Sequence, residues 1–151
     1  MIDLARQSPA AAHWSRQQYE DLFVTALSRP AAEHFAWVVE DDRGGLSEKV
    51  PIDSFEIIAF LVAQRVDAEW ELQNIVVAEK ARRQGMGVNL LGYFVAYARD
   101  GGGSGIFLEV RLTNRAAQAL YGKLGFEETG LRKNYYVSPA EDAILYRLSL
   151  R

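Results

Sequence analysis

The segment from Arg82 to Gly87, which reads RRQGMG, has the residue types needed to bind an anion. It lies between a predicted strand and a predicted helix, where free backbone N–H groups and the positive end of the helix dipole can hold a phosphate oxygen. No Gly-Lys-Ser/Thr follows it, and Leu90 stands where a dinucleotide fingerprint requires a third glycine. It is therefore neither a Walker A loop nor that fingerprint. An ordinary glycine turn with solvated arginines is the alternative.

A second group of candidate residues begins in Ile106–Leu112, which reads IFLEVRL. Glu109 is a lone carboxylate in this strand, an unusual choice for a buried position, and burial there would make it a better proton acceptor. The alternative is that it faces the sheet edge and pairs with Arg111. Asn114 and Tyr121 are seven residues apart and so share one face of a helix. They could instead be a plain N-cap and a half-buried aromatic.

A predicted alternation of strands and helices positions these residues. Ser15 and Gln18 have the spacing of a capping box, Trp14 and Tyr19 that of a hydrophobic staple, and Gly125 is typical of a helix end. The strand–helix order after position 70 implies parallel strands, the tail predicts an antiparallel pair, and 41–54 is a long hairpin loop. We predict one α/β domain, 1–151, with a mixed sheet. Expected strands are 34–40, 55–64, 70–77, 106–112, 126–136 and 143–150, and expected helices are 15–28, 87–99 and one that begins after Asn114.

Composition excludes several classes of function. Of the 151 residues 49% are hydrophobic, which fits a globular domain and not a disordered tail protein. The chain has no cysteine, which excludes disulfides, thiolate nucleophiles and cysteine-based metal sites, and His13 and His34 lack ligand-like spacing, so we expect no metal. The net charge of −3 offers no basic face for nucleic acid. Because no apolar run is as long as a membrane span, we expect a cytoplasmic protein with no membrane partner.

The order and spacing of several segments resemble those of the GNAT acyltransferases. The tail segments RKNYY and EDA resemble the branch that acetylates protein N-terminal amines, close to the RimI-type ribosomal-protein alanine acetyltransferases. The resemblance covers about 34–148 and implies the GNAT fold, a mixed central sheet with a splayed strand pair and flanking helices. The segments that carry it are NIVV of 74–77, the Arg82-x-x-Gly85-x-Gly87 loop, LEVR of 108–111, Asn114 with LYGKLGF of 120–126, RKNYY of 132–136 and EDA of 141–143.

The resemblance implies acetyl-CoA as the acetyl donor. In GNAT enzymes the strand before the phosphate loop splays from its neighbour, and the pantetheine arm enters the gap and pairs with main chain. The main chain of Ile75, Val76 and Val77 would take that role, although their side chains also suit a plain core strand. Asn114 would contact the cofactor. The pyrophosphate would lie on the residues Arg82, Arg83, Gln84, Gly85, Met86, Gly87 and Val88.

The resemblance also implies direct attack of an amine on the thioester. Since a thioester is already activated, the enzyme mainly aligns the amine, removes its proton and assists the departing thiolate. Glu109 is the implied base, acting through water, and Tyr121 the implied acid. Tyr135 and Tyr136 would help line a groove for a peptide's first residues, with core packing as the alternative. The implied acceptor is a protein N-terminus, that of a ribosomal protein included.

Other interpretations stay open on the sequence alone. The family usually begins with a strand before the first helix, whereas only Ile2–Arg6 precedes Pro9 here. We therefore expect that the first strand is absent or that the start is late, and that the edge of the 34–40 strand is exposed. The acceptor could be a small amine or an antibiotic, against which RKNYY and EDA argue. A non-catalytic acyl-CoA-binding module is the third interpretation, against which Glu109 and Tyr121 argue. The oligomeric state is open.

Overall fold

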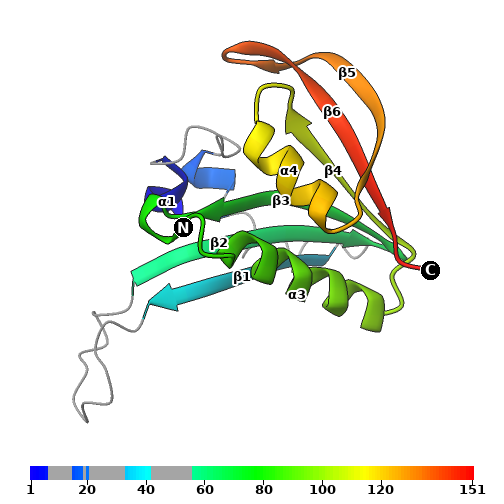
Figure 1. Ribbon diagram of the computed structural model, residues 1–151, viewed down its shortest axis with the longest axis horizontal. Coiled ribbons are helices and arrows are strands. Elements are labelled where there is room, and N and C mark those ends of the chain that lie inside the picture. The colour runs from blue at the N-terminus through cyan, green and yellow to red at the C-terminus, as the bar shows by residue number, and fades with distance from the viewer. Residues whose placement is uncertain (7–14, 19, 21–32, 42–55) are drawn as a thin grey trace.

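The computed structural model describes residues 1–6, 15–18, 20, 33–41 and 56–151 (Figure 1). The predicted strands and the two later helices are confirmed to within a few residues. The elements are α1 (Ile2–Arg6), β1 (Glu33–Asp41), β2 (Glu56–Val66), β3 (Glu69–Val77), the 3-10 helix η3 (Glu79–Ala81), α3 (Met86–Asp100), β4 (Gly105–Arg111), α4 (Arg115–Lys123), β5 (Glu127–Val137) and β6 (Ala140–Ser149).

The early part of the chain is only partly described. The Ser15 N–H donates to Gln18 Oε1 over 2.7 Å and the Gln18 N–H to Ser15 Oγ over 3.2 Å, so the capping box is confirmed. Trp14, Tyr19, His13, most of the helix expected up to position 28 and the 42–54 loop lie outside the described residues.

The six strands form one mixed sheet in the order β1-β2-β3-β4-β6-β5. β3 and β4 are parallel, and the other neighbouring pairs are antiparallel. The predicted α/β class with a mixed sheet is therefore confirmed. Residues Ile2–Arg6 form the helix α1, so that in the described part of the chain no strand precedes β1, which lies at one edge of the sheet.

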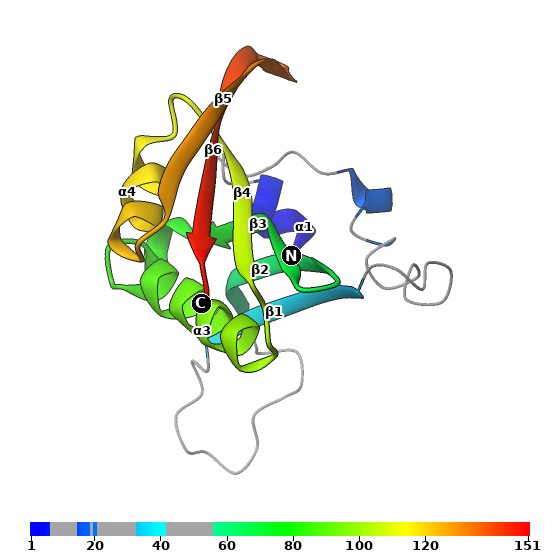
Figure 2. The ribbon, with the colours of Figure 1, turned by 90° about the vertical axis from the view of Figure 1, so that its right-hand side faces the viewer.

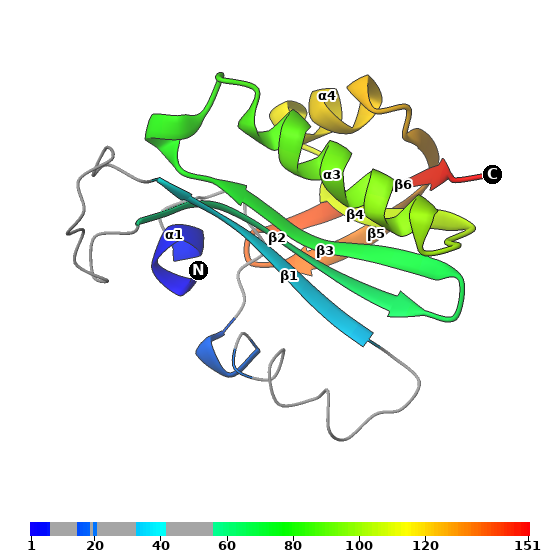
Figure 3. The same ribbon diagram turned by 90° about the horizontal axis from the view of Figure 1, so that it is seen from below.

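Helices cover both faces of the sheet. α3 and α4 lie on one face and α1 on the other (Figures 2 and 3). Toward α3 the fully buried Trp70, Leu91 and Phe94 form the larger core, which Trp37 joins with its ring 5.3 Å from that of Phe94. On the opposite face Leu4 and Ala5 of α1 pack with residues of β2. Burial on both faces explains why β2 reads as a continuous apolar run.

The parallel strands β3 and β4 pair only at their beginnings and then diverge. Their last pair joins Leu72 to Leu108, although both strands continue beyond it. The next residue, Gln73, is a bulge in the ladder with β2, because it has no partner between the pairs made by Leu72 and Asn74. A bulge bends and twists its strand, which turns the rest of β3 away from β4. The splayed strand pair implied by the resemblance is present (Figure 1).

Candidate active site

The turn before α3 leaves the N-terminus of that helix open. Gly85 is the N-cap residue, with a φ of 80°, and no side chain caps the first turn. This left-handed conformation favours glycine, which has no Cβ to clash. Since the first N–H groups of a helix have no acceptor within the helix, those of Met86, Gly87 and Val88 face outward as potential anion donors.

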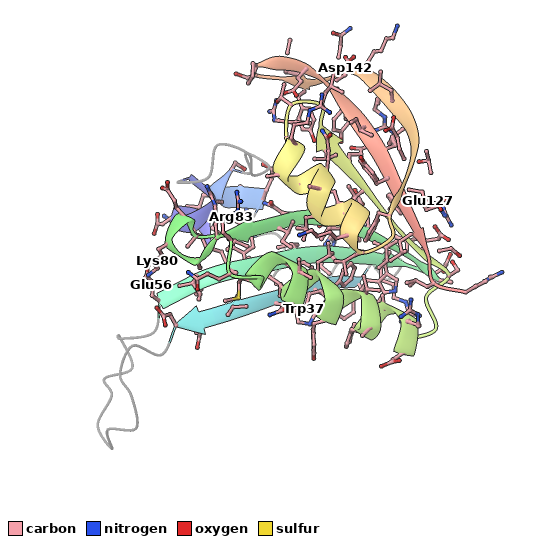
Figure 4. All side chains as sticks on the ribbon, viewed as in Figure 1. Trp37, Glu56, Lys80, Arg83, Glu127 and Asp142 are labelled. Carbon is pink, nitrogen blue, oxygen red and sulfur yellow. The ribbon has the colours of Figure 1, made fainter. Side chains whose placement is uncertain are left out.

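Side chains fix this turn to its surroundings. Arg82 Nε donates to the carbonyl oxygen of Val77 over 3.1 Å, and Gln84 Nε2 donates to that of Lys80 over 2.9 Å. Lys80 in turn pairs with Glu56. Both arginines of the predicted phosphate site are exposed, and Figure 4 shows Arg83 at the turn. Arg82 therefore holds the loop against the end of β3 in addition to any role toward an anion.

The open helix end, the splayed end of β3 and helix α4 meet at Gly87. A Cβ there would lie 3.4 Å from Leu120 Cδ2 and 3.7 Å from Val77 Cγ2. The side chains of Ile75 and Val77 pack against the larger core and that of Val76 lies in the smaller one. Their side chains are thus core residues, as one interpretation expects, while the edge of β3 that faces away from β2 has no β4 partner after Leu72.

Glu109 lies one residue beyond the last β3–β4 pair and is ion-paired. Arg132 Nη1 of β5 lies 2.6 Å from Glu109 Oε1. The predicted alternative, a pair with Arg111, is wrong: Arg111 Nη1 lies 3.1 Å from Glu141 Oε2, and its guanidinium carbon lies 4.0 Å from the centre of the Tyr136 ring. The physical reason is that the β5–β6 hairpin brings its own charges to both residues of β4.

The two tyrosines of RKNYY lie beside Glu109 because β5 is irregular there. The β5–β6 register shifts between Arg132 and Tyr136, Asn134 has a φ of 52°, and its N–H donates to a carboxylate oxygen of the hairpin over 2.8 Å. The Tyr135 hydroxyl donates a hydrogen bond to Glu109, which raises the pKa of Tyr135 to about 12. Burial raises the pKa of Tyr136, and the Glu109 carboxylate adds to this increase.

Asn114 precedes the first residue of α4, and Tyr121 lies in its last turn. Asn114 Oδ1 accepts a hydrogen bond from the Ala117 N–H over 3.1 Å, so its N-cap role is confirmed. Tyr121 is only 6% exposed, and its ring lies 5.8 Å from Phe126 and 5.9 Å from Tyr146. Burial raises the pKa of Tyr121 well above the usual value of a phenol. Its hydroxyl therefore keeps its proton at neutral pH.

The EDA segment forms hydrogen bonds to the turn before α4 and to the irregular part of β5. Glu141 Oε1 accepts hydrogen bonds from the Thr113 N–H over 2.6 Å and from Thr113 Oγ1 over 2.7 Å, just before α4 begins. These bonds, with help from Arg111, hold the pKa of Glu141 below its usual value. Asp142 accepts the Asn134 N–H at the far end of the hairpin (Figure 4).

Sequence reasoning missed several residues of this site. Arg132, Glu141 and Asp142 belong to segments that carried the resemblance, but nothing local in them shows which groups they contact. Glu71 of β3 also lies close to Glu109, whose negative charge raises the pKa of Glu71. The alternation of polar and apolar residues in 69–73, which read EWELQ, is the sequence signal that could have placed Glu71 on the same side as Glu69 and Gln73.

The model of the Acetyltransferase (GNAT) family matches residues 3–126 of the chain. The chain belongs to the GNAT family. This GNAT chain is 40% identical over 97 residues to the [ribosomal protein bS18]-alanine N-acetyltransferase of Escherichia coli strain K12. The match spans 63% of the GNAT chain but 66% of the relative, just under two thirds of its length.

Solved structures agree with the GNAT assignment. The crystal structure of the ribosomal-protein-S18-alanine N-acetyltransferase from Escherichia coli superposes with a TM-score of 0.76 at 27% identity, covering 99% of this GNAT chain and 84% of that one. A GNAT family acetyltransferase from Elizabethkingia anophelis with acetyl-CoA bound gives a TM-score of 0.59 at 22% identity over 76% and 97% of the two chains. The latter likeness shows the fold alone, a fold that binds acetyl-CoA in that protein.

In the described ranges of this GNAT chain, no group of three histidine, aspartate or glutamate residues is arranged to hold a metal ion. The helices found there are all too short or too polar to cross a membrane.

Proposed function

We propose that this chain transfers the acetyl group of acetyl-CoA to the N-terminal α-amine of a protein by direct attack, without an acyl-enzyme. The observation that carries the proposal is the placement of Glu109 at the mouth of the splayed strands. Tyr136 lies close enough to interact electrostatically with both the buried phenol of Tyr121 and the carboxylate of Glu109. We infer that Glu109 serves as the proton acceptor and Tyr121 as the proton donor for a reaction in the gap between β3 and β4.

The residues present fit acetyl-CoA. The edge of β3 after Leu72 has no strand partner on the β4 side, which suits pairing with the amide groups of a pantetheine arm. The uncapped first turn of α3 suits a pyrophosphate. We infer that Ile75, Val76 and Val77 pair through main chain, that residues 82–88 hold the pyrophosphate and that Asn114 contacts the cofactor. Bound there, the thioester would supply an activated acetyl group.

The protein's own residues would carry the proton transfers. A free α-amine has a pKa near 8, so most of it is an unreactive ammonium at neutral pH. Glu109 would accept the proton of this ammonium through a water molecule. Arg132 and Tyr135 hold the Glu109 carboxylate in place by an ion pair and a hydrogen bond. Tyr121, which remains protonated at neutral pH, would donate its proton toward the departing sulfur and regain one from the nitrogen as the amide forms.

The acceptor is inferred from the tail of the chain and from its relatives. Two relatives, from Escherichia coli and Haemophilus influenzae, are named for alanine N-acetylation of ribosomal protein bS18, and they are 40% and 38% identical over the matched regions. Tyr135 and Tyr136 lie beside Glu109, where they can line a groove for a peptide's first residues. We therefore propose a protein chain end as acceptor, with a ribosomal protein as the first to test. Such an acceptor would place the enzyme in the cytoplasm.

A panel of hexapeptides tests this function. The peptides differ only in their first residue (Ala, Gly, Ser, Met, Leu or Glu), share one internal lysine, and are offered with the N-terminus free or blocked. We expect acetylation of the free N-terminus, fastest with a small first residue, as located by mass spectrometry. Equal acetylation of the blocked peptides on lysine would contradict an N-terminal acceptor. Preference for a polyamine over every peptide would favour a small amine as the substrate.

A further inference from the structure

Glu71 lies on the same side of the sheet as Glu109, where β3 and β4 begin to separate. In the parallel ladder Glu71 is opposite Phe107, and Glu109 is two residues further along β4. Side chains two apart on a strand point to one face, so both carboxylates share the face opposite α3. They are near enough for the charge of Glu109 to raise the pKa of Glu71. Together they form an acidic corner next to Tyr135.

Only one of the two carboxylates at this corner has a cationic partner among the described residues. Arg132 pairs with Glu109, but within the described residues no lysine, arginine or histidine forms an ion pair with Glu71, which is half-buried. The preceding glutamate on this face, Glu69, shows the contrast: Arg147 Nη2 lies 2.7 Å and Ser104 Oγ 2.6 Å from its Oε1. Burying a carboxylate without a cation is unfavourable, and burial is the main reason why the pKa of Glu71 is raised.

Hydrogen-bonding capacity at the corner points to a ligand with donors. The side chain of Gln73, the bulge residue of β3, donates to Gln64 Oε1 over 2.9 Å and also to the Glu71 carboxylate. The Oε1 of Gln73 is buried and has no hydrogen-bond partner among the described residues. Glu71, Glu109 and this amide oxygen are all acceptors. A primary ammonium carries a positive charge and three N–H donors, so it supplies what the corner lacks.

We propose that Glu71 binds the protonated α-amine of the acceptor beside Glu109 and thereby selects a charged chain end. This inference rests on the proposed function and adds a binding residue that holds the ammonium before Glu109 receives its proton. A lysine side chain carries the same ammonium chemistry, and the blocked peptides of the panel distinguish that source from the chain end.

The test measures how strongly the protein prefers an acceptor that has an amine. Calorimetry with CoA present, so that no turnover occurs, compares the Ala-first hexapeptide with a matched peptide in which propionyl replaces the alanyl residue and only the amine is missing. We expect the wild-type protein to bind the amine form roughly tenfold or more tightly, as charge-assisted hydrogen bonds allow. Glu71→Gln should lose most of this preference, and Glu71→Asp should retain part of it.

Glu69→Gln is the matched control. It removes the same charge from the same face of β3, but from a carboxylate that already has its own cation, so it should keep the wild-type preference. Kinetics give a second reading: Glu71→Gln should raise the peptide KM roughly tenfold with little change in kcat or in the acetyl-CoA KM. Thermal unfolding of each variant verifies that it is folded.

Two outcomes overturn the inference alone: the wild-type protein acetylates the panel while Glu71→Gln keeps the full preference, or Glu69→Gln loses as much as Glu71→Gln. In the second case general surface charge, and not Glu71, attracts the peptide. If the wild-type protein neither binds nor acetylates any peptide of the panel, the proposed function falls and the inference falls with it.

Discussion

The two sides of the V between β3 and β4 are built in different ways. On the side of β3 and α3, the groups suited to acetyl-CoA are main-chain groups. They are left open because β3 loses its β4 partner after Leu72 and because no side chain caps the first turn of α3. On the side of β4 and the β5–β6 hairpin, the candidate groups are the side chains of Glu109, Arg132 and Tyr135. These come from strands distant in sequence.

The two sides should tolerate different kinds of substitution. A main-chain site depends on backbone conformation, so it should respond to proline or to a change at a left-handed glycine and scarcely to most side chains. A side-chain site should respond to the loss of single functional groups while the backbone stays the same. Variants on the side of β3 and α3 should therefore change acetyl-CoA affinity, and variants on the side of β4 and the hairpin should change turnover.

The largest effect on turnover is expected for Glu109→Gln. Glutamine keeps nearly the same volume but cannot accept a proton, so kcat should fall by about 10²–10⁴-fold, the usual contribution of one general base. Acetyl-CoA affinity, measured by calorimetry, should change little. Full activity of the variant between pH 6 and pH 9 would show that Glu109 is not the base.

The largest effect on acetyl-CoA affinity is expected for Gly85→Pro. Proline fixes φ near −65°, whereas Gly85 has a φ of 80°, so the turn before α3 must rearrange and binding should weaken by about 100-fold or more. Gly92→Ala is the matched control within α3, because nothing lies within 4 Å of a Cβ there. It should leave affinity unchanged and stabilise the helix by about 0.5–1 kcal/mol. Unchanged affinity in a folded Gly85→Pro protein would move the pyrophosphate site elsewhere.

A smaller loss of turnover is expected for Tyr121→Phe. The ring contacts with Phe126 and Tyr146 are kept, so the melting temperature should hardly move, while kcat should fall roughly 10- to 100-fold for loss of the proton donor. Since the pKa of Tyr121 is raised, wild-type kcat should show no decline from its ionisation up to pH 9. A wild-type Tyr121 that ionises below pH 9 would contradict its burial.

The smallest effect is expected for Glu141→Gln, which acts on stability. The folded-state pKa of Glu141 lies below the ordinary value of 4.5, so its stabilisation is fully present above that value and disappears as the pH falls through the folded-state pKa. The melting temperature of the variant should therefore be lower than that of the wild-type protein at pH 7, and the difference should shrink in acid. A difference that grew in acid would reverse the sign assigned to this carboxylate.

Local signals in the sequence were enough to predict the elements on the side of β3 and α3. The glycine pair at positions 85 and 87, the strand before it and the apolar stripe after it predict a strand, an open turn and a helix. Each of these depends on interactions between near neighbours. The cap at Asn114 and the left-handed Gly125 are local in the same sense, and both are found as predicted.

The side that uses side chains was decided by tertiary structure. The sequence contains Glu109 and Arg111 two residues apart, but the hairpin gives Glu109 a different partner, Arg132, because that partner lies close only after β5 pairs with β6. The bulge at Gln73, which opens the V, likewise exists only in the register of β3 against β2. Local sequence patterns decide which elements form and which functional groups they carry. Strand register and long-range pairing decide which of those groups meet, since both are set by contacts between residues far apart in the chain.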